Sequence, residues 1–263
     1  MSNNQSKNSL KTEQTILISG AGSGIGRALA QVLAAAGHRI VLLGRNEQTL
    51  AETRATLPSP DKHAIITADI RDAAAIRAGL AALKPVLHGV VANAGVGGEN
   101  HYGDGDRWEE ILSTNLTGSY QLVQEALPYF GPPESGFRQI VLISSILARL
   151  GVPGYSAYCA SKAGLLGLMR VWAAELAPQK ILVNAICPGW VQTEMATQGL
   201  ETFALSSGQS YEAVYQEQMA QVPLGKMSEP AEIAQLVAFL LSGQQQSITG
   251  QTFDINNGAI MPA

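Results

Sequence analysis

The stretch TILISGAGSGIG, residues 15–26, joins a short β-type run directly to a glycine-rich turn and a helix-type segment. Glycine allows a tight turn and a close approach of the backbone to a phosphate, and the N–H groups at the start of the following helix attract anions. The glycines follow a Gly-x-x-x-Gly-x-Gly pattern, since the third glycine of Gly-x-Gly-x-x-Gly would fall at Ile25. Strand, turn and helix in this order predict a site for the pyrophosphate of a dinucleotide.

The same alternation continues along the chain. Short β-type runs occur at 15–19, 39–44, 63–67, 87–93, 139–144, 181–187 and 251–255. Several of them are near-continuous Val, Ile and Leu, as is typical of buried parallel strands. Helical patterns lie between them at 25–36, 47–56, 73–83, 107–130, 155–176 and 231–241. This order predicts an α/β fold, a Rossmann-like doubly wound parallel sheet of about seven strands with helices on both faces.

The domain organisation follows from where this pattern starts and where it is interrupted. Residues 1–14 are polar and rich in Asn, Ser and Lys, so we expect a disordered N-terminal tail. Residues 15–263 are expected to form a single NAD(P)-binding Rossmann domain. Residues 191–224 contain no strand-type run, and we interpret them as a helical lid over the substrate, with a packed pair of surface helices as the alternative.

The composition excludes several classes of protein. A net charge of −4 without a Lys/Arg run argues against nucleic-acid binding. The chain has no run of about 18 apolar residues and no apolar core of a secretory signal, so we expect a soluble cytoplasmic protein without a membrane contact. Two cysteines, Cys159 and Cys187, do not make a disulfide framework. No metal site is expected, because the histidines lack partners at ligand spacing: His38, His63, His88 and His101.

Tyr158 and Lys162 lie four residues apart in an expected helix, which places the phenol and the ammonium on one face. A phenol ordinarily loses its proton near pH ~10, and a neighbouring ammonium favours the phenolate and lowers that pKa. The tyrosine would then give or take a proton near neutral pH. Ser145 could hydrogen-bond a substrate oxygen. For the Tyr–Lys pair taken alone, the alternative is an exposed helix face.

The end of the second expected strand bears on the choice of dinucleotide. NAD-binding folds place an acidic residue there to bind the ribose hydroxyls, whereas this chain has Gly44 followed by Arg45. A guanidinium pairs well with a 2′-phosphate, and Gly44 removes the carboxylate that would repel it. These residues favour NADP(H) over NAD(H); the alternative is that Arg45 only begins the next loop.

With these motifs in order, the sequence resembles the single-domain branch of the short-chain dehydrogenases/reductases from about residue 15 to 262. Residues 19–26 resemble the family's coenzyme turn Thr-Gly-x-x-x-Gly-Ile-Gly, with serine in place of threonine. Tyr158 and Lys162 match its Tyr-x-x-x-Lys pair, and Ser145 matches its catalytic serine. Asn115 matches the asparagine that holds a proton-relay water.

The resemblance also implies nucleotide contacts in three further segments. Residues 69–70 match the segment that contacts adenine, 93–95 the Asn-Ala-Gly segment along the cofactor, and 188–193 the Pro-Gly-x-x-x-Thr segment that meets the nicotinamide. Together with Arg45, the expected cofactor-binding residues are Ser19, Gly20, Ser23, Gly24, Ile25, Gly26, Asp69, Ile70, Asn93, Ala94, Gly95, Tyr158, Lys162, Pro188, Gly189, Val191 and Thr193.

The activity implied by the resemblance is hydride transfer between a nicotinamide and a carbonyl or secondary-alcohol carbon. In reduction, Ser145 would bind the carbonyl oxygen and Tyr158 would protonate it. Lys162 would hold the nicotinamide ribose and lower the tyrosine pKa, while Asn115 would keep a water in line. Residues 187–191 and 222–241 look most like 3-oxoacyl-thioester and polyketide-type ketoreductases. The alternatives are a dehydrogenase that oxidises a cyclic alcohol, diol or sugar, and a non-catalytic nucleotide-binding sensor.

The expected substrate pocket and partners complete this interpretation. A mostly apolar wall with aromatic members suits a ketone or an acyl chain, and its expected members are Val96, Ser145, Leu147, Val152, Tyr155, Trp190 and Met195. In relatives, the helices that correspond to 107–130 and 155–176 pair about a two-fold axis. The resemblance therefore implies a homo-oligomer, a dimer or a tetramer.

Overall fold

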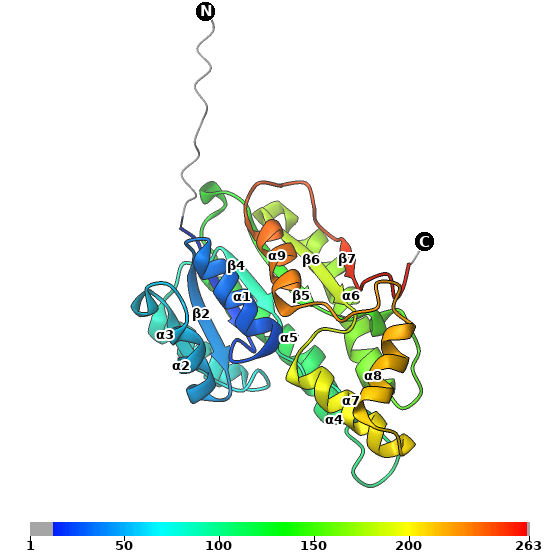
Figure 1. Cartoon of the computed structure of the whole chain (residues 1–263). Helices are drawn as coiled ribbons and strands as arrows, with labels where there is room; N and C mark the ends of the chain where they lie inside the picture. Colours follow the sequence, from blue (N-terminus) through cyan, green and yellow to red (C-terminus); the bar gives the residue numbers. More distant parts are fainter. Residues whose placement is uncertain (1–12, 262–263) are drawn as a thin grey trace, which may run out of the picture.

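The structure, a computed structural model, describes residues 13–261. Its centre is a parallel sheet of seven strands in the order β3-β2-β1-β4-β5-β6-β7 (Figure 1). The strands are β1 (Thr15–Ser19), β2 (Arg39–Gly44), β3 (Ala64–Thr67), β4 (Gly89–Ala92), β5 (Arg138–Ile143), β6 (Ile181–Pro188) and β7 (Thr252–Ile255). The predicted α/β fold with a doubly wound sheet of about seven strands is confirmed.

Helices cover both faces of the sheet and bury two hydrophobic clusters. They are α1 (Gly24–Ala35), α2 (Glu47–Ala55), α3 (Ala73–Leu83), α4 (Trp108–Leu112), α5 (Gly118–Ala126), α6 (Ser156–Leu176), α7 (Glu194–Ser207), α8 (Tyr211–Ala220) and α9 (Pro230–Leu241). One cluster unites α1, α2 and α9 with the sheet, and the other unites α3, α5 and α6 with it. Figure 1 shows α1 and α9 side by side on their face. Because both faces are covered, the central strands β5 and β6 are buried along their whole length and are mostly apolar.

The strand order places the candidate site. β1 pairs with β2 on one side and with β4 on the other, so the chain reverses its direction of winding between β1 and β4. In sheets of this kind, ligands bind beyond the carboxyl ends of the strands at that switch point. The glycine turn leaves β1 at this point, and the segment that begins at Asn93 leaves β4 beside it.

The predicted helix over 107–130 is wrong as one continuous α-helix. It consists of α4, a π-helical turn η2 (Ser113–Thr117), α5 and a 3-10 turn η3 (Leu127–Tyr129). Pro128 lacks an N–H group and favours the ending of α5, whereas the π turn has no signal in the residue pattern. The other predicted helices and strands are present with ends that differ by at most three residues.

The predicted N-terminal tail lies mostly outside the described residues, whereas the predicted lid lies within them. Of the predicted disordered tail, residues 1–12 lie outside the described residues. Residues 13 and 14, the last two of the predicted tail, are ordered. The carbonyl of Gln14 accepts from the N–H of Arg39 at 2.8 Å, and Glu13 pairs with Lys62. The segment 191–224 contains α7 and α8, which pack around a hydrophobic cluster of their own. Among residues 13–261, no helix combines the length and apolarity needed to cross a bilayer.

Candidate active site

The coenzyme turn after β1 requires glycine at several positions. Gly20 and Gly24 have φ values of +66° and +50°, a region that favours glycine. A Cβ on Gly26 would overlap the carbonyl oxygen of Gly20. Ser23 makes no side-chain capping bond at the start of α1, so the first-turn N–H groups lack that partner. The turn is therefore shaped as a cradle for an anion such as a pyrophosphate.

Ser19 and Asn93 join the ends of β1 and β4 at the switch point. The Ser19 hydroxyl accepts from the N–H groups of Asn93 and Ala94, both at 3.0 Å. Asn93 Nδ2 donates to the Ser19 carbonyl at 3.0 Å. The Ser19 side chain is fully buried, so these bonds fix the backbone on which the nucleotide would rest.

Tyr158 and Lys162 share one face of α6, as their spacing predicted. Lys162 Nζ lies 5.6 Å from the centroid of the Tyr158 ring and donates to the Ile143 carbonyl at 3.0 Å. The Ser144 hydroxyl donates to the Lys162 carbonyl at 2.8 Å, which ties α6 to the end of β5. Only 5 % of Lys162 is exposed, so its ammonium is removed from bulk water.

The expected lowering of the Tyr158 pKa by Lys162 stays a prediction. Burial raises the pKa of Tyr158 above its ordinary value, and a hydrogen bond with Ser145 opposes that rise only in part. Burial also lowers the pKa of Lys162 to about 8.

Asn115 lies in the π turn η2 and anchors the segment after β4. Its Oδ1 accepts from the N–H of Val96 at 2.8 Å, and its Nδ2 donates to the Val96 carbonyl and to the Ser161 hydroxyl. Gly95 allows this approach, because a Cβ there would lie 3.0 Å from Asn115 Oδ1 and 3.4 Å from Lys162 Nζ. The structure thus brings Asn115, Lys162 and this segment together.

Ser145 begins the segment that follows β5. Its hydroxyl accepts from the N–H of Leu147 at 3.1 Å, which fixes the side chain beside Tyr158. An ion pair at 3.3 Å between Arg149 and Asp254 ties the same segment to β7. The segment that carries the Ser145 hydroxyl is therefore held at its start by the bond to Leu147 and at its end by the ion pair of Arg149.

The Pro-Gly segment after β6 returns to the coenzyme turn. Pro188 and Val191 are buried, and a Cβ on Gly189 would lie 3.0 Å from Asn256. Thr193 lies against Gly24, since a Cβ there would be 3.2 Å from the threonine methyl. The segment that precedes α7 therefore borders the anion cradle.

Three residues are expected to contact the adenosine part of the nucleotide, and the structure leaves a different part of each one free to do so. Arg45 is exposed at the end of β2. Hydrogen bonds with Arg71 and Arg107 lower the pKa values of Asp69 and Glu110 respectively, and the charge of Arg45 adds a smaller lowering to both. The Asp69 carboxylate is already paired with Arg71, at 2.7 Å to Nη2. The Ile70 side chain is buried against Gly118, so only its backbone remains for a nucleotide.

The expected pocket-wall residues differ in what the structure places beside them. Met195 of α7 packs against Gly97, whose Cβ position is also 3.9 Å from the Tyr158 ring. The Tyr155 ring lies 6.2 Å from that of Phe203 in α7. Trp190 packs with the cluster of α7 and α8. The remaining wall residues Val96, Leu147 and Val152 are partly exposed.

Sequence reasoning missed Ser161 and Asn100. Ser161 joins Asn115 to α6, and Asn100 is a buried asparagine bonded to the start of that helix. A polar side chain in a glycine-rich loop gives no signal of such a distant partner. Within residues 13–261, no three His, Cys, Asp or Glu side chains are grouped so as to hold a metal ion.

Comparison with known proteins identifies the family. A family model described as enoyl-(acyl carrier protein) reductase matches residues 20–259. The chain belongs to the short-chain dehydrogenase/reductase family. A curated member, the 3-oxoacyl-(acyl-carrier-protein) reductase FabG of Staphylococcus aureus, is 32% identical over 262 residues, which cover 96% of this chain and 100% of that protein.

Solved structures of ketoreductases in this family share the architecture. A single-residue variant of the actinorhodin polyketide ketoreductase with NADPH has a TM-score of 0.88 at 32% identity, covering 95% of this chain and 98% of that one. A 3-oxoacyl-(acyl-carrier-protein) reductase from Brucella melitensis with bound NAD has a TM-score of 0.81 at 29% identity, covering 96% and 93%. Both forms of nicotinamide dinucleotide therefore occur among the relatives, and the glycine cradle at α1 fits the pyrophosphate they share.

Proposed function

We propose that this short-chain dehydrogenase/reductase uses NADP(H) to reduce a ketone to a secondary alcohol, with a 3-oxoacyl thioester among its substrates. The observation that carries the proposal is the position of Tyr158, whose ring lies 5.6 Å from Lys162 Nζ and whose side chain hydrogen-bonds with Ser145. Burial raises the pKa of Tyr158, so the phenol keeps its proton at neutral pH beside the Ser145 hydroxyl. A protonated phenol is the form that a reductase needs, because the developing alkoxide takes up a proton.

Each catalytic side chain then has a defined task. The nucleotide supplies the hydride, and the protein binds, orients and protonates. Ser145 donates a hydrogen bond to the substrate carbonyl oxygen, and Tyr158 gives its proton to that oxygen. Lys162 binds the nicotinamide ribose. Asn115 holds a water near Lys162 that restores the proton.

The alternative direction is oxidation of a cyclic alcohol, diol or sugar by the same residues. Oxidation needs the phenolate as a base, and the raised pKa of Tyr158 makes that form scarce at neutral pH. The raised pKa of Tyr158 supports reduction as the proposed direction. The remaining alternative is a nucleotide-binding sensor, which would bind the nucleotide without oxidising or reducing it.

The acidic residues near the site bear on which carrier group a thioester substrate can have. Residues 191–224 contain four glutamates and no lysine, arginine or histidine, and the glutamates are exposed: Glu194, Glu201, Glu212 and Glu217. The loop after β4, whose Gly97 lies against Met195 of α7, adds Glu99, Asp104 and Asp106 and carries one cation, Arg107. Fixed charges of one sign repel a ligand of the same sign, most strongly at low salt. Uncharged ketones and thioesters should therefore enter more readily than thioesters of a phosphate-bearing carrier.

Oxidation of NADPH, followed by absorbance with a panel of substrates, tests this function. We expect turnover of ketones and of 3-oxoacyl thioesters of N-acetylcysteamine, which is uncharged. The coenzyme A thioester with the same acyl group should give a lower kcat/KM, and added salt should narrow the difference. Equal values at low salt would contradict the electrostatic argument. Tight NADPH binding without oxidation across the panel would contradict the reductase.

The preference for NADP(H) is supported by Gly44 and Arg45. Replacing Gly44→Asp and Arg45→Ile together should shift the ratio of kcat/KM for NADPH over NADH by roughly ten- to a hundredfold towards NADH, because a hydrogen bond to a charged group is lost and a carboxylate is gained. Steady-state kinetics with both nucleotides measure the ratio. Arg54→Ile in α2 removes a charge nearby and should leave it unchanged. An unchanged ratio in the double variant would place the phosphate contact elsewhere.

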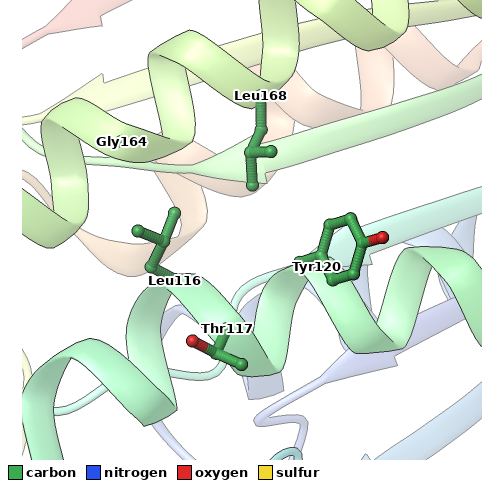
Figure 2. A pocket seen from close by; sticks show the side chains of 5 residues that line it. All are labelled: Leu116, Thr117, Tyr120, Gly164 and Leu168. Carbon is green, nitrogen blue, oxygen red and sulfur yellow. The ribbon is translucent and has the colours of Figure 1, made fainter. Parts of the chain in front are cut away.

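The outer face of α5 and α6 supports a homo-oligomer. A shallow apolar groove lies between the two helices, lined by Leu116, Thr117, Tyr120, Gly164 and Leu168 (Figure 2). Tyr120 is 46% exposed, and its ring stacks at 6.1 Å on Trp172. An apolar face of this kind, formed by η2, α5 and α6, suits pairing with a second copy about a two-fold axis.

A further inference from the structure

The helix that carries Tyr158 and Lys162 lacks a cap of its own. The residue before α6 is Tyr155, and its side chain makes no capping hydrogen bond. The first N–H groups of a helix have no partner within it, so they need an acceptor from elsewhere. Tyr158 lies in this first turn, and its position depends on how the turn is held.

Asn100 supplies the missing acceptor from the loop after β4. Its Oδ1 accepts from the N–H of Ala157 at 2.9 Å and from the Ser156 hydroxyl at 3.1 Å. Its own backbone N–H donates to the Gly154 carbonyl at 2.8 Å. Only 5 % of Asn100 is exposed, so these bonds are shielded from water. A buried asparagine from a distant loop thus caps the catalytic helix.

The other end of the same amide reaches α4. Asn100 Nδ2 donates to Asp106 Oδ1 at 3.2 Å, and that oxygen also accepts from the N–H of Trp108, the first residue of α4. α4 continues into the turn with Asn115, which bonds to Ser161 of α6. Two hydrogen-bonded connections therefore join α4 to α6. One runs through Asn115 and Ser161, and the other runs through Asn100 at the start of α6.

We propose that Asn100 is a positioning residue that holds the first turn of α6, and with it the Tyr158 hydroxyl, in register with Ser145. This rests on the proposed role of Tyr158 as the proton donor. Asn100 acts through Ala157 and Asp106. Displacement of a proton donor by a fraction of an ångström affects the chemical step more than the binding of either substrate.

The test compares Asn100→Ala with a matched control. Asn100→Ala should lower kcat roughly ten- to a hundredfold with little change in the KM for NADPH. Asn184 is also buried and bridges two segments, with bonds to Ile248 and Gln251, but it lies on β6 and makes no bond to α6. Asn184→Ala should lower the thermal midpoint and leave kcat unchanged. Equal kcat losses in the two variants would reduce Asn100 to a general structural residue and overturn the proposal.

A swap variant tests the geometry of the bridge. Asn100→Asp alone places two carboxylates together and should stay impaired. Asn100→Asp combined with Asp106→Asn restores a donor opposite an acceptor, and both helix starts keep a side-chain acceptor. The double variant should recover most of the kcat lost in N100A. Failure of this rescue in a folded double variant would contradict the proposed bridge.

A measurement independent of turnover separates this proposal from the proposed function. Amide hydrogen exchange by mass spectrometry should show the start of α6 exchanging about five- to tenfold faster in N100A, because a helix cap is lost. Asn184→Ala should leave that peptide unchanged. If the parent protein reduces no ketone, this readout still tests the cap. Unchanged exchange at the start of α6 would overturn the positioning role even in an active enzyme.

Discussion

Replacing Tyr158 by phenylalanine is expected to lower kcat roughly a hundred- to ten-thousand-fold, the usual contribution of a positioned general acid. Phenylalanine keeps the ring beside Gly97, so the shape of the site is retained. The nucleotide cradle at α1 is untouched, and NADPH should bind with nearly unchanged affinity. Stopped-flow absorbance for turnover and nucleotide fluorescence for binding measure the two effects separately.

Tyr155→Phe is the matched control for this variant. Tyr155 precedes the same helix, and burial together with nearby Glu99 raises its pKa to about 12. Its ring packs on Phe203, and phenylalanine preserves that contact. We expect Tyr155→Phe to leave kcat within about threefold, since no proton passes through it. Loss of activity in Y155F with activity retained in Y158F would mean that the proton donor has been misassigned.

The raised pKa of Tyr158 also sets the pH dependence of the reduction. The acid must be protonated, and a folded pKa above the ordinary value extends the protonated range upward. The kcat for ketone reduction should therefore stay level through neutral pH and fall only as the pH rises through the alkaline pKa of this tyrosine. A fall in kcat that begins near neutral pH would show that the tyrosine pKa is lowered when substrates are bound.

The sequence predicted those parts of the fold that depend on local patterns. β1 and β2 are apolar runs bounded by polar or glycine residues, and their ends were predicted without error. α3 was also predicted without error, and it starts at the capping side chain of Asp72. The break in the helix over 107–130 was not predicted, because the π turn depends on Asn115 bonding to Val96, a contact made across the fold.

The candidate site shows the same division between local and distant causes. The spacing of Tyr158 and Lys162 predicted a shared helix face, since that depends only on helix geometry. Their pKa values could not be predicted, because both follow from burial beneath segments that come from β4, β5 and α7. The role of Asn100 depends on a partner 57 residues away, and no spacing rule reaches that far.

The Lys162→Met variant is expected to lose turnover and yet to gain stability relative to the parent as the pH falls from 10 to 7. Lys162 has a pKa of about 8 in the folded protein against an ordinary value of 10.5. The unfolded chain therefore binds more protons between these values, and burial of the charged lysine is a cost to the folded parent below pH 8. The cost is on the order of 3 kcal/mol and disappears as the pH rises towards 10.5.

Urea unfolding of parent and K162M at pH 7 and pH 10 measures this directly. The lost hydrogen bond to the Ile143 carbonyl shifts the variant by a similar amount at both pH values, so the change between them isolates the lysine charge. The parent should gain on the order of 2 to 3 kcal/mol relative to the variant from pH 7 to pH 10. Lys226→Met removes a half-exposed lysine paired with Glu232 and should show no such change over this range.

A parent–variant difference that is the same at both pH values would mean that Lys162 keeps an ordinary pKa. The tyrosine would then have a charged neighbour throughout its titration, and Lys162 would lower its pKa.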